Sequence, residues 1–161
     1  MRSPKLIAAL ALAAGLIAPM AVAALPAAAS SMASFCQVEL YDIDNLNVDE
    51  RDGKDELRFL VGGNLFPNNG YYNMRNGDDG DPADFGFPST VVSDTGSVSF
   101  DLREVTPPAV GRGDSLGTAT VSGSSVCAPL AVGASTTVVD YVDGTDETFY
   151  SYRVELEVTG L

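Results

Sequence analysis

The stretch that decides the fold lies near the C-terminal end, where residues 150–158 read Tyr-Ser-Tyr-Arg-Val-Glu-Leu-Glu-Val. Aromatic or aliphatic side chains occupy every second position, and polar or charged ones occupy the positions between them. A period of two is the pattern of a β-strand that has one face on a core and the other in water. The same alternation, or a run of β-branched residues, predicts strands in five more segments: 38–41, 56–61, 97–103, 118–122 and 136–142.

Turn sequences separate these segments, and no apolar repeat of helical spacing follows Ser30. The turn dipeptides include Asp52-Gly53, Gly62-Gly63, Asn76-Gly77 and Asp143-Gly144. We therefore expect an all-β domain, an antiparallel β-sandwich of seven to eight strands, with a closed barrel as the second choice. Residues 67–88 are rich in Asn, Gly and Asp, and we expect a long loop there.

The first residues have the composition of an export signal. Arg2 and Lys5 precede an apolar run over 6–18, and small residues follow it up to Ala29. This order is typical of a secretory signal peptide, so we assign residues 1–29 to the signal and 30–161 to one secreted domain. Cleavage after Ala23 and a retained membrane anchor are the alternatives. After cleavage at Ala29 we expect no membrane insertion.

The chain has two cysteines, Cys36 and Cys127, and both follow the predicted signal. In an exported protein an even number of cysteines favours a disulfide. We therefore predict a Cys36–Cys127 bond, with two free buried thiols as the alternative.

The charge balance excludes several classes of function. Without Arg2 and Lys5 the chain has seven basic and 22 acidic residues, a net charge of −15. Such a chain repels nucleic acid and anionic lipid. The sequence has no His, which excludes a Ser-His-Asp triad and a His-ligated metal site. Carboxylate pairs are expected by chance among so many acids, so we predict that the protein is not an enzyme.

The acidic residues form three groups, over 42–56, 78–84 and 140–147, and we place each group in a predicted loop. Calcium takes six to eight oxygen ligands and accepts irregular geometry, which Asp-, Asn- and Gly-rich loops can supply. None of the three groups matches the EF-hand pattern. The alternative is a solvated acidic surface that keeps an exported protein soluble.

Two segments resemble the C2-type β-sandwich, a calcium- and lipid-binding fold. They are DERDGKDELRFLVGG over 49–63 and VSFDLREVTPPAVGRGDSLGTATV over 98–121. The chain also resembles small exported bacterial β-sandwich proteins of little-known role, which carry an acidic segment before a strand. The C2 resemblance implies calcium ligands at one end of the sandwich: Asp49, Asp52, Asp55, Glu104 and Asp114.

Two functions follow as hypotheses. The first is a secreted, non-enzymatic β-sandwich whose acidic loops bind calcium or a basic partner. The alternative is a structural or interaction protein of the cell envelope that binds protein or glycan through a Tyr-rich surface, with Tyr71, Tyr72 and Met74 as candidate contacts. A small hydrolase that uses two carboxylates is a third hypothesis.

Overall fold

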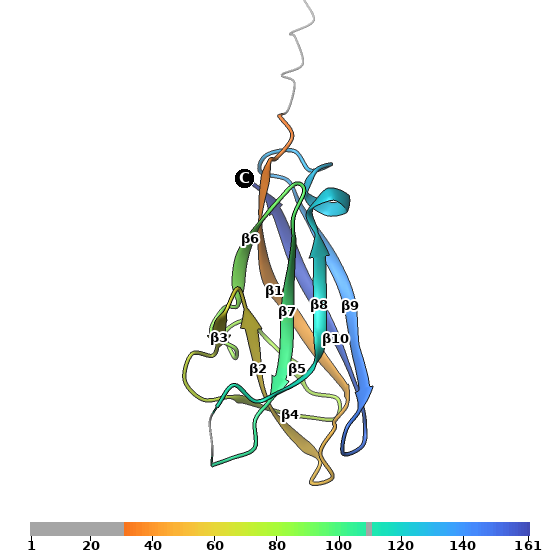
Figure 1. Cartoon of the computed structure of the whole chain (residues 1–161). Helices are drawn as coiled ribbons and strands as arrows, with labels where there is room; N and C mark the ends of the chain where they lie inside the picture. Colours follow the sequence, from red (N-terminus) through yellow and green to blue (C-terminus); the bar gives the residue numbers. More distant parts are fainter. Residues whose placement is uncertain (1–30, 109–110) are drawn as a thin grey trace, which may run out of the picture.

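A computed structural model describes residues 31–108 and 111–161 of the chain. The predicted signal peptide, residues 1–29, lies outside the described residues. Two antiparallel sheets pack face to face, which confirms the expected all-β sandwich (Figure 1). Within the described part of the chain, no helix is long and apolar enough to cross a membrane.

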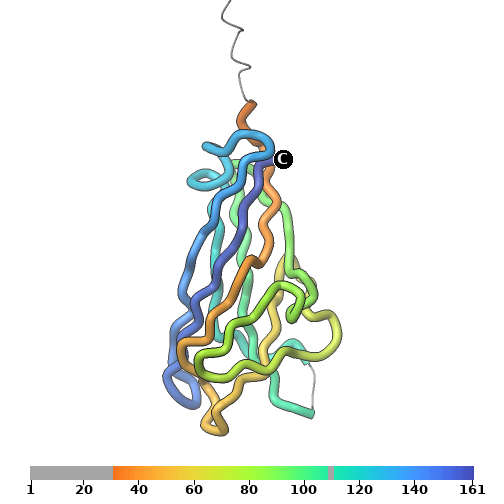
Figure 2. Tube along the Cα trace, turned by 180° about the vertical axis from the view of Figure 1, so that it is seen from behind, coloured from red at the N-terminus to blue at the C-terminus, as the bar shows by residue number. Residues whose placement is uncertain are grey.

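The first sheet is built around the two long strands at the ends of the domain. Its order is β5-β1-β10-β9, and β6 pairs with the same edge of β1 as β5 does. Figure 2 shows β1, β10 and β9 running side by side. The strand bounds are β1 Phe35–Asn47, β5 Asp79–Gly80, β6 Ser89–Ser93, β9 Ser135–Thr145 and β10 Phe149–Gly160.

The second sheet has the order β3-β2-β7-β8, and β4 also pairs with β2. Its strand bounds are β2 Lys54–Val61, β3 Asn64–Phe66, β4 Tyr72–Arg75, β7 Ser97–Glu104 and β8 Asp114–Ser122. A single π-helical turn, η1 (Gly123–Cys127), follows β8. The described residues thus form more strands than the sequence predicted, because β3, β4 and β5 are only two to four residues long.

The core lies between the two sheets, and the alternation seen in the sequence places it there. In β10 the even-numbered residues from Tyr150 to Gly160 are buried and the odd-numbered ones between them are half-buried. The second sheet contributes Leu57, Phe59 and Val61 from β2 and Phe100 and Leu102 from β7. Burial of this apolar surface is the main stabilising term of the fold.

The disulfide predicted from the sequence is present. Cys36 near the start of β1 is bonded to Cys127 at the end of η1, with the two Cα atoms 5.7 Å apart. Both residues are fully buried. The bond joins the first sheet to the turn that follows the second sheet, and disulfides of this kind persist in non-reducing surroundings.

The predicted long loop and the predicted acidic loops are more ordered than expected. Residues 67–88 contain β4 and β5, and β5 pairs with β1. Asp42 and Asp44 lie within β1, and Asp55 lies within β2, so these three acids belong to strands. Four more acids of the three groups also lie within strands: Glu56 in β2, Asp79 in β5, and Asp140 and Asp143 in β9. The expectation that every acidic group sits in a loop was wrong for all of these acids, because strand pairing extends further than the apolar alternation.

Candidate functional site

The five predicted calcium ligands lie at one end of the sandwich, the end opposite the C-terminus (Figure 1). Asp49 follows β1, Asp55 lies at the start of β2, and Asp52 lies between them. Glu104 ends β7 and Asp114 begins β8, and these two residues are cross-strand partners. The strand order therefore brings the two acidic segments to the same end.

Two of the five carboxylates, those of Asp49 and Asp55, are fully buried and accept backbone hydrogen bonds. Asp49 is fully buried and accepts hydrogen bonds from the backbone N–H groups of Asp146, Glu147 and Thr148, at 3.3, 3.4 and 3.1 Å. Asp55 is also fully buried. It accepts hydrogen bonds from the backbone N–H groups of Asp49 and Glu50, at 2.8 and 2.9 Å, and from the hydroxyl of Tyr152. These bonds tie together the β1–β2 turn, the β9–β10 turn and the core.

Glu104 lies beside this pair, and its pKa lies well above the ordinary value of a carboxyl group. Burial, followed by the negative charges of Asp55, Glu50 and Asp49, raises the pKa of Glu104 to about 8. Its carboxyl is hydrogen-bonded to the carboxylate of Glu50. Burial also raises the pKa of Asp55 above its ordinary value. A carboxyl group that keeps its proton carries no charge, which lowers the repulsion at this end of the sandwich.

The other two predicted ligands are exposed. The carboxylate Oδ2 of Asp52 lies 3.9 Å from the ammonium Nζ of Lys54, and Asp114 is exposed at the start of β8. Among residues 31–108 and 111–161, no three of the five predicted ligands bring carboxylate oxygens within 4.8 Å of one another. The structure thus gathers these residues at one end without forming a compact set of oxygen ligands.

A compact carboxylate triad does occur, at Asp42, Asp44 and Asp79, whose nearest oxygens all lie within 4.8 Å of one another. It forms because Asp44 of β1 is the cross-strand partner of Asp79 of β5. Burial, followed by a hydrogen bond and repulsion from Asp79, raises the pKa of Asp42 to about 6. Arg153 forms an ion pair with Asp44 at 3.0 Å. Nothing in the sequence pattern indicated that β1 and β5 would pair.

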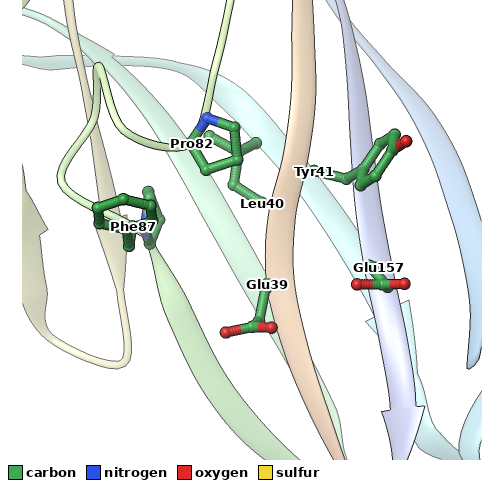
Figure 3. Close-up of a pocket in the computed structure, with 7 residues that line it drawn as sticks. Glu39, Leu40, Tyr41, Pro82, Phe87 and Glu157 are labelled. Carbon is green, nitrogen blue, oxygen red and sulfur yellow. The ribbon is translucent and has the colours of Figure 1, made fainter.

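A second acidic site lies on the outer face of the first sheet, where it is combined with aromatic rings. A cavity of about 210 Å³ is bounded by β1, β10 and the segment before β6 (Figure 3). Its lining residues are Glu39, Leu40, Tyr41, Pro82, Phe87, Pro88 and Glu157. Below, this cavity is called the Tyr41–Phe87 pocket. Its aromatic residues are both more than half exposed, Tyr41 at 55% and Phe87 at 66%.

The two carboxylates of the pocket come from adjacent strands. Glu39 of β1 and Glu157 of β10 are direct cross-strand partners on the outer face of the sheet (Figure 3). Glu39 accepts a hydrogen bond from the side-chain amide of Gln37 at 2.7 Å. Within the described residues neither carboxylate has an Arg or Lys nitrogen within 4.0 Å.

The residues proposed from the sequence as contacts of a Tyr-rich surface are placed differently. Met74 is fully buried in the core. Tyr72 is half-buried, and its ring packs edge-on against Phe85 with centroids 5.3 Å apart. Tyr71 is half-buried as well. Met74 and Tyr72 therefore help to pack the segment onto the sandwich, and the exposed aromatic residues are found instead on the first sheet.

Comparison with known proteins identifies similarity of structure alone. No protein-family model and no curated protein matches the chain. Among solved structures, the chain is similar to C2 domain A of a plant extended synaptotagmin 1, with a TM-score of 0.45 and 9% identity over 81% of this chain and 98% of that one.

A second solved structure, C2 domains A and B of extended synaptotagmin 2, has a TM-score of 0.45 and 12% identity. The match covers 94% of this chain and 48% of that chain. Both structures consist of C2 domains. At these identities the similarity concerns the sandwich fold and says nothing about what this chain binds.

Proposed function

We propose that the protein is an exported, non-enzymatic β-sandwich that binds a basic polypeptide partner through its acidic surface. The observation that carries this proposal is the outer face of the first sheet, where Glu39 and Glu157 lie side by side next to exposed aromatic rings. Neither carboxylate is in an ion pair with a described Lys or Arg. Surfaces of this composition complement a basic partner both in charge and in apolar contact.

The cations in the described part of the chain leave Glu39 and Glu157 uncompensated. Of the seven basic residues in the described part of the chain, Lys54, Arg103 and Arg153 are in ion pairs with neighbouring acids. A fourth, Arg58, is only 2% exposed and donates its hydrogen bonds to backbone carbonyls. The excess negative charge therefore faces solvent, where it can steer a positively charged partner.

The end of the sandwich that holds the five predicted calcium ligands supports this function less well than the outer face of the first sheet does. The oxygens of Asp49 and Asp55 are occupied by backbone N–H groups and by the hydroxyl of Tyr152. A cation at these two residues would have to replace hydrogen bonds that hold the turns together. A cation at Glu39 and Glu157, on the outer face of the first sheet, would not displace any hydrogen bond that holds a turn.

The test is a calorimetric titration of residues 30–161 with a short peptide of alternating Gly and Lys, in the presence of a chelator. A peptide of alternating Gly and Glu is the control. We expect the lysine peptide alone to bind, and its affinity to fall as salt is raised from about 0.01 to about 0.15 M, which shortens the Debye length from about 30 to about 8 Å. Equal heats for the two peptides would remove the proposal.

Calcium at the Asp42–Asp44–Asp79 triad is the second candidate function. It is favoured by one observation, the approach of three carboxylates within 4.8 Å, which supplies hard oxygen ligands at one point. If calcium binds there, titration with calcium should release heat in the wild type and none in Asp79→Asn. The exposed Asp52→Asn variant serves as a control of equal charge and should bind as the wild type does.

A further inference from the structure

We infer that the Tyr41–Phe87 pocket receives the cationic end of a single Lys or Arg side chain from a basic polypeptide. The charge of that side chain would lie between Glu39 and Glu157, and its aliphatic stem would lie against the two rings. This inference rests on the proposed function and adds to it the position and chemistry of the contact.

The backbone of two segments, β1 and the segment before β6, exposes the rings of the pocket. Tyr41 is the extra residue of a β-bulge in β1, because Leu40 pairs with Leu156 and Asp42 pairs with the adjacent Glu155. Tyr41 follows the outward alternation of Phe35, Gln37 and Glu39, and the bulge adds the neighbouring Asp42 to the same outer face. Tyr41 is therefore exposed between a buried Leu40 and a half-buried Asp42.

Phe87 has a φ of 59°, the left-handed conformation that side chains other than Gly rarely adopt. The surrounding contacts hold it there. Its N–H donates to the carbonyl of Pro82 at 2.8 Å, and the carbonyl of Pro88 accepts the N–H of Leu40 at 2.9 Å. Phe85, two residues earlier, is fully buried and packs edge-on against Phe59 with centroids 5.1 Å apart. The same short segment thus anchors one phenylalanine in the core and presents the other to solvent.

The two negative charges of the pocket, on Glu39 and Glu157, favour the binding of a cation. Like charges at directly opposite positions of an antiparallel pair destabilise the sheet, and Glu39 and Glu157 are such a pair. The described residues provide no Lys or Arg nitrogen within 4.0 Å of either carboxylate. An incoming ammonium or guanidinium group would form two charge-assisted hydrogen bonds here and remove the repulsion.

The aromatic residues extend this complementarity. A cation over the face of a Tyr or Phe ring is attracted by the ring quadrupole, and the aliphatic stem of Lys or Arg packs well on apolar surface. The pocket therefore combines the two features that distinguish a cationic side chain from a metal ion, which has no stem to pack.

The size of the pocket and its surroundings favour a polypeptide over a free small molecule. Its volume of about 210 Å³ is below the roughly 300–1,000 Å³ of pockets that enclose a whole ligand. The surrounding face carries further exposed apolar side chains that could contact the rest of a bound chain. They are Phe35 on β1, Val91 on β6, and Val139 and Tyr141 on β9.

The test compares the affinity of the Gly-Lys peptide for the wild type and for three variants by calorimetry. Glu39→Gln with Glu157→Gln should weaken binding roughly tenfold, the effect of losing two partly exposed ion pairs. Phe87→Ala should weaken it about two- to fivefold, the size of one exposed cation–π contact. Glu147→Gln, an exposed acid on the β9–β10 turn, should leave the affinity unchanged. Thermal unfolding of each variant verifies that the fold is retained, since all the substituted side chains lie outside the core.

The outcomes separate this inference from the proposed function. Binding that is weakened at the pocket and not by Glu147→Gln supports both. If the lysine peptide binds the wild type and the pocket variants equally, the pocket assignment is overturned and the proposed function stands. Absence of binding to the wild type overturns both.

Discussion

Substituting Glu104 by Gln should make the stability of the protein less dependent on pH. Burial and the charges of Asp55, Glu50 and Asp49 raise the pKa of Glu104 from 4.5 to about 8. The native state therefore binds a proton that the unfolded state has released. The stabilisation this proton provides is fully present below about pH 4.5 and is lost as the pH rises through about 8.

The structure sets the size of the effect. A shift of one pKa unit corresponds to about 1.4 kcal/mol, so the full shift would give an upper limit of about 5 kcal/mol. Glu104 is only half-buried, and solvent screens part of the repulsion. We therefore expect the wild type to lose about 2 kcal/mol of unfolding free energy between about pH 6 and about pH 9 because of this group. The side-chain amide of Gln can donate to Glu50 as the protonated acid does, and it remains neutral throughout.

The assay is urea unfolding at a series of pH values and constant ionic strength. Glu104→Gln should lose less stability than the wild type above neutral pH, and the two should differ most at the alkaline end. The exposed Glu147→Gln variant removes the same charge from the neighbouring turn and should follow the wild-type profile. Parallel profiles for wild type and Glu104→Gln would show that Glu104 has an ordinary pKa in the native protein, and would refute the prediction.

Two further predictions concern the stability of the fold. Replacing Cys36 and Cys127 by Ala opens a loop with a sequence separation of 91 residues. By the chain-entropy relation this should lower the unfolding free energy by about 4–5 kcal/mol, measured as a lower urea midpoint; an unchanged midpoint would show that the bond does not constrain the unfolded chain. Arg58→Leu should cost about 2–4 kcal/mol, because the buried guanidinium donates to the carbonyls of Gly111 and Pro67, at 2.6 and 2.8 Å, and these would lose their donor. Arg58→Lys should recover only part of this loss, since an ammonium lacks the planar fork that reaches both loops; full recovery would refute that role for the fork.

The sandwich was predictable from the sequence because strand alternation is a local property. The run over 150–158 has period two, and in the structure every second residue along β10 is buried against the core. The disulfide was predictable for a related reason: two cysteines in a chain with the composition of an exported protein allow a single pairing.

The arrangement of the acids could not be read from the sequence in the same way. Asp44 meets Asp79 only because β5 pairs with β1, and that pairing joins residues far apart in the chain. The bulge at Tyr41 and the left-handed backbone of Phe87 likewise depend on tertiary contacts. Asp49 and Asp55 were proposed as metal ligands from their residue type and spacing. The structure shows that both carboxylates instead accept hydrogen bonds from backbone N–H groups, which explains their spacing equally well.

The central claim is that the outer face of the first sheet is where a cationic partner binds. Amide chemical shifts of the isotope-labelled domain, recorded while the Gly-Lys peptide is added, test it most directly. We predict saturable shifts in β1 around Tyr41, in β10 around Glu157 and in the segment around Phe87, with little change at the Asp49–Asp55 turn. Shifts concentrated at that turn, or scattered over both sheets without saturation, would contradict the claim.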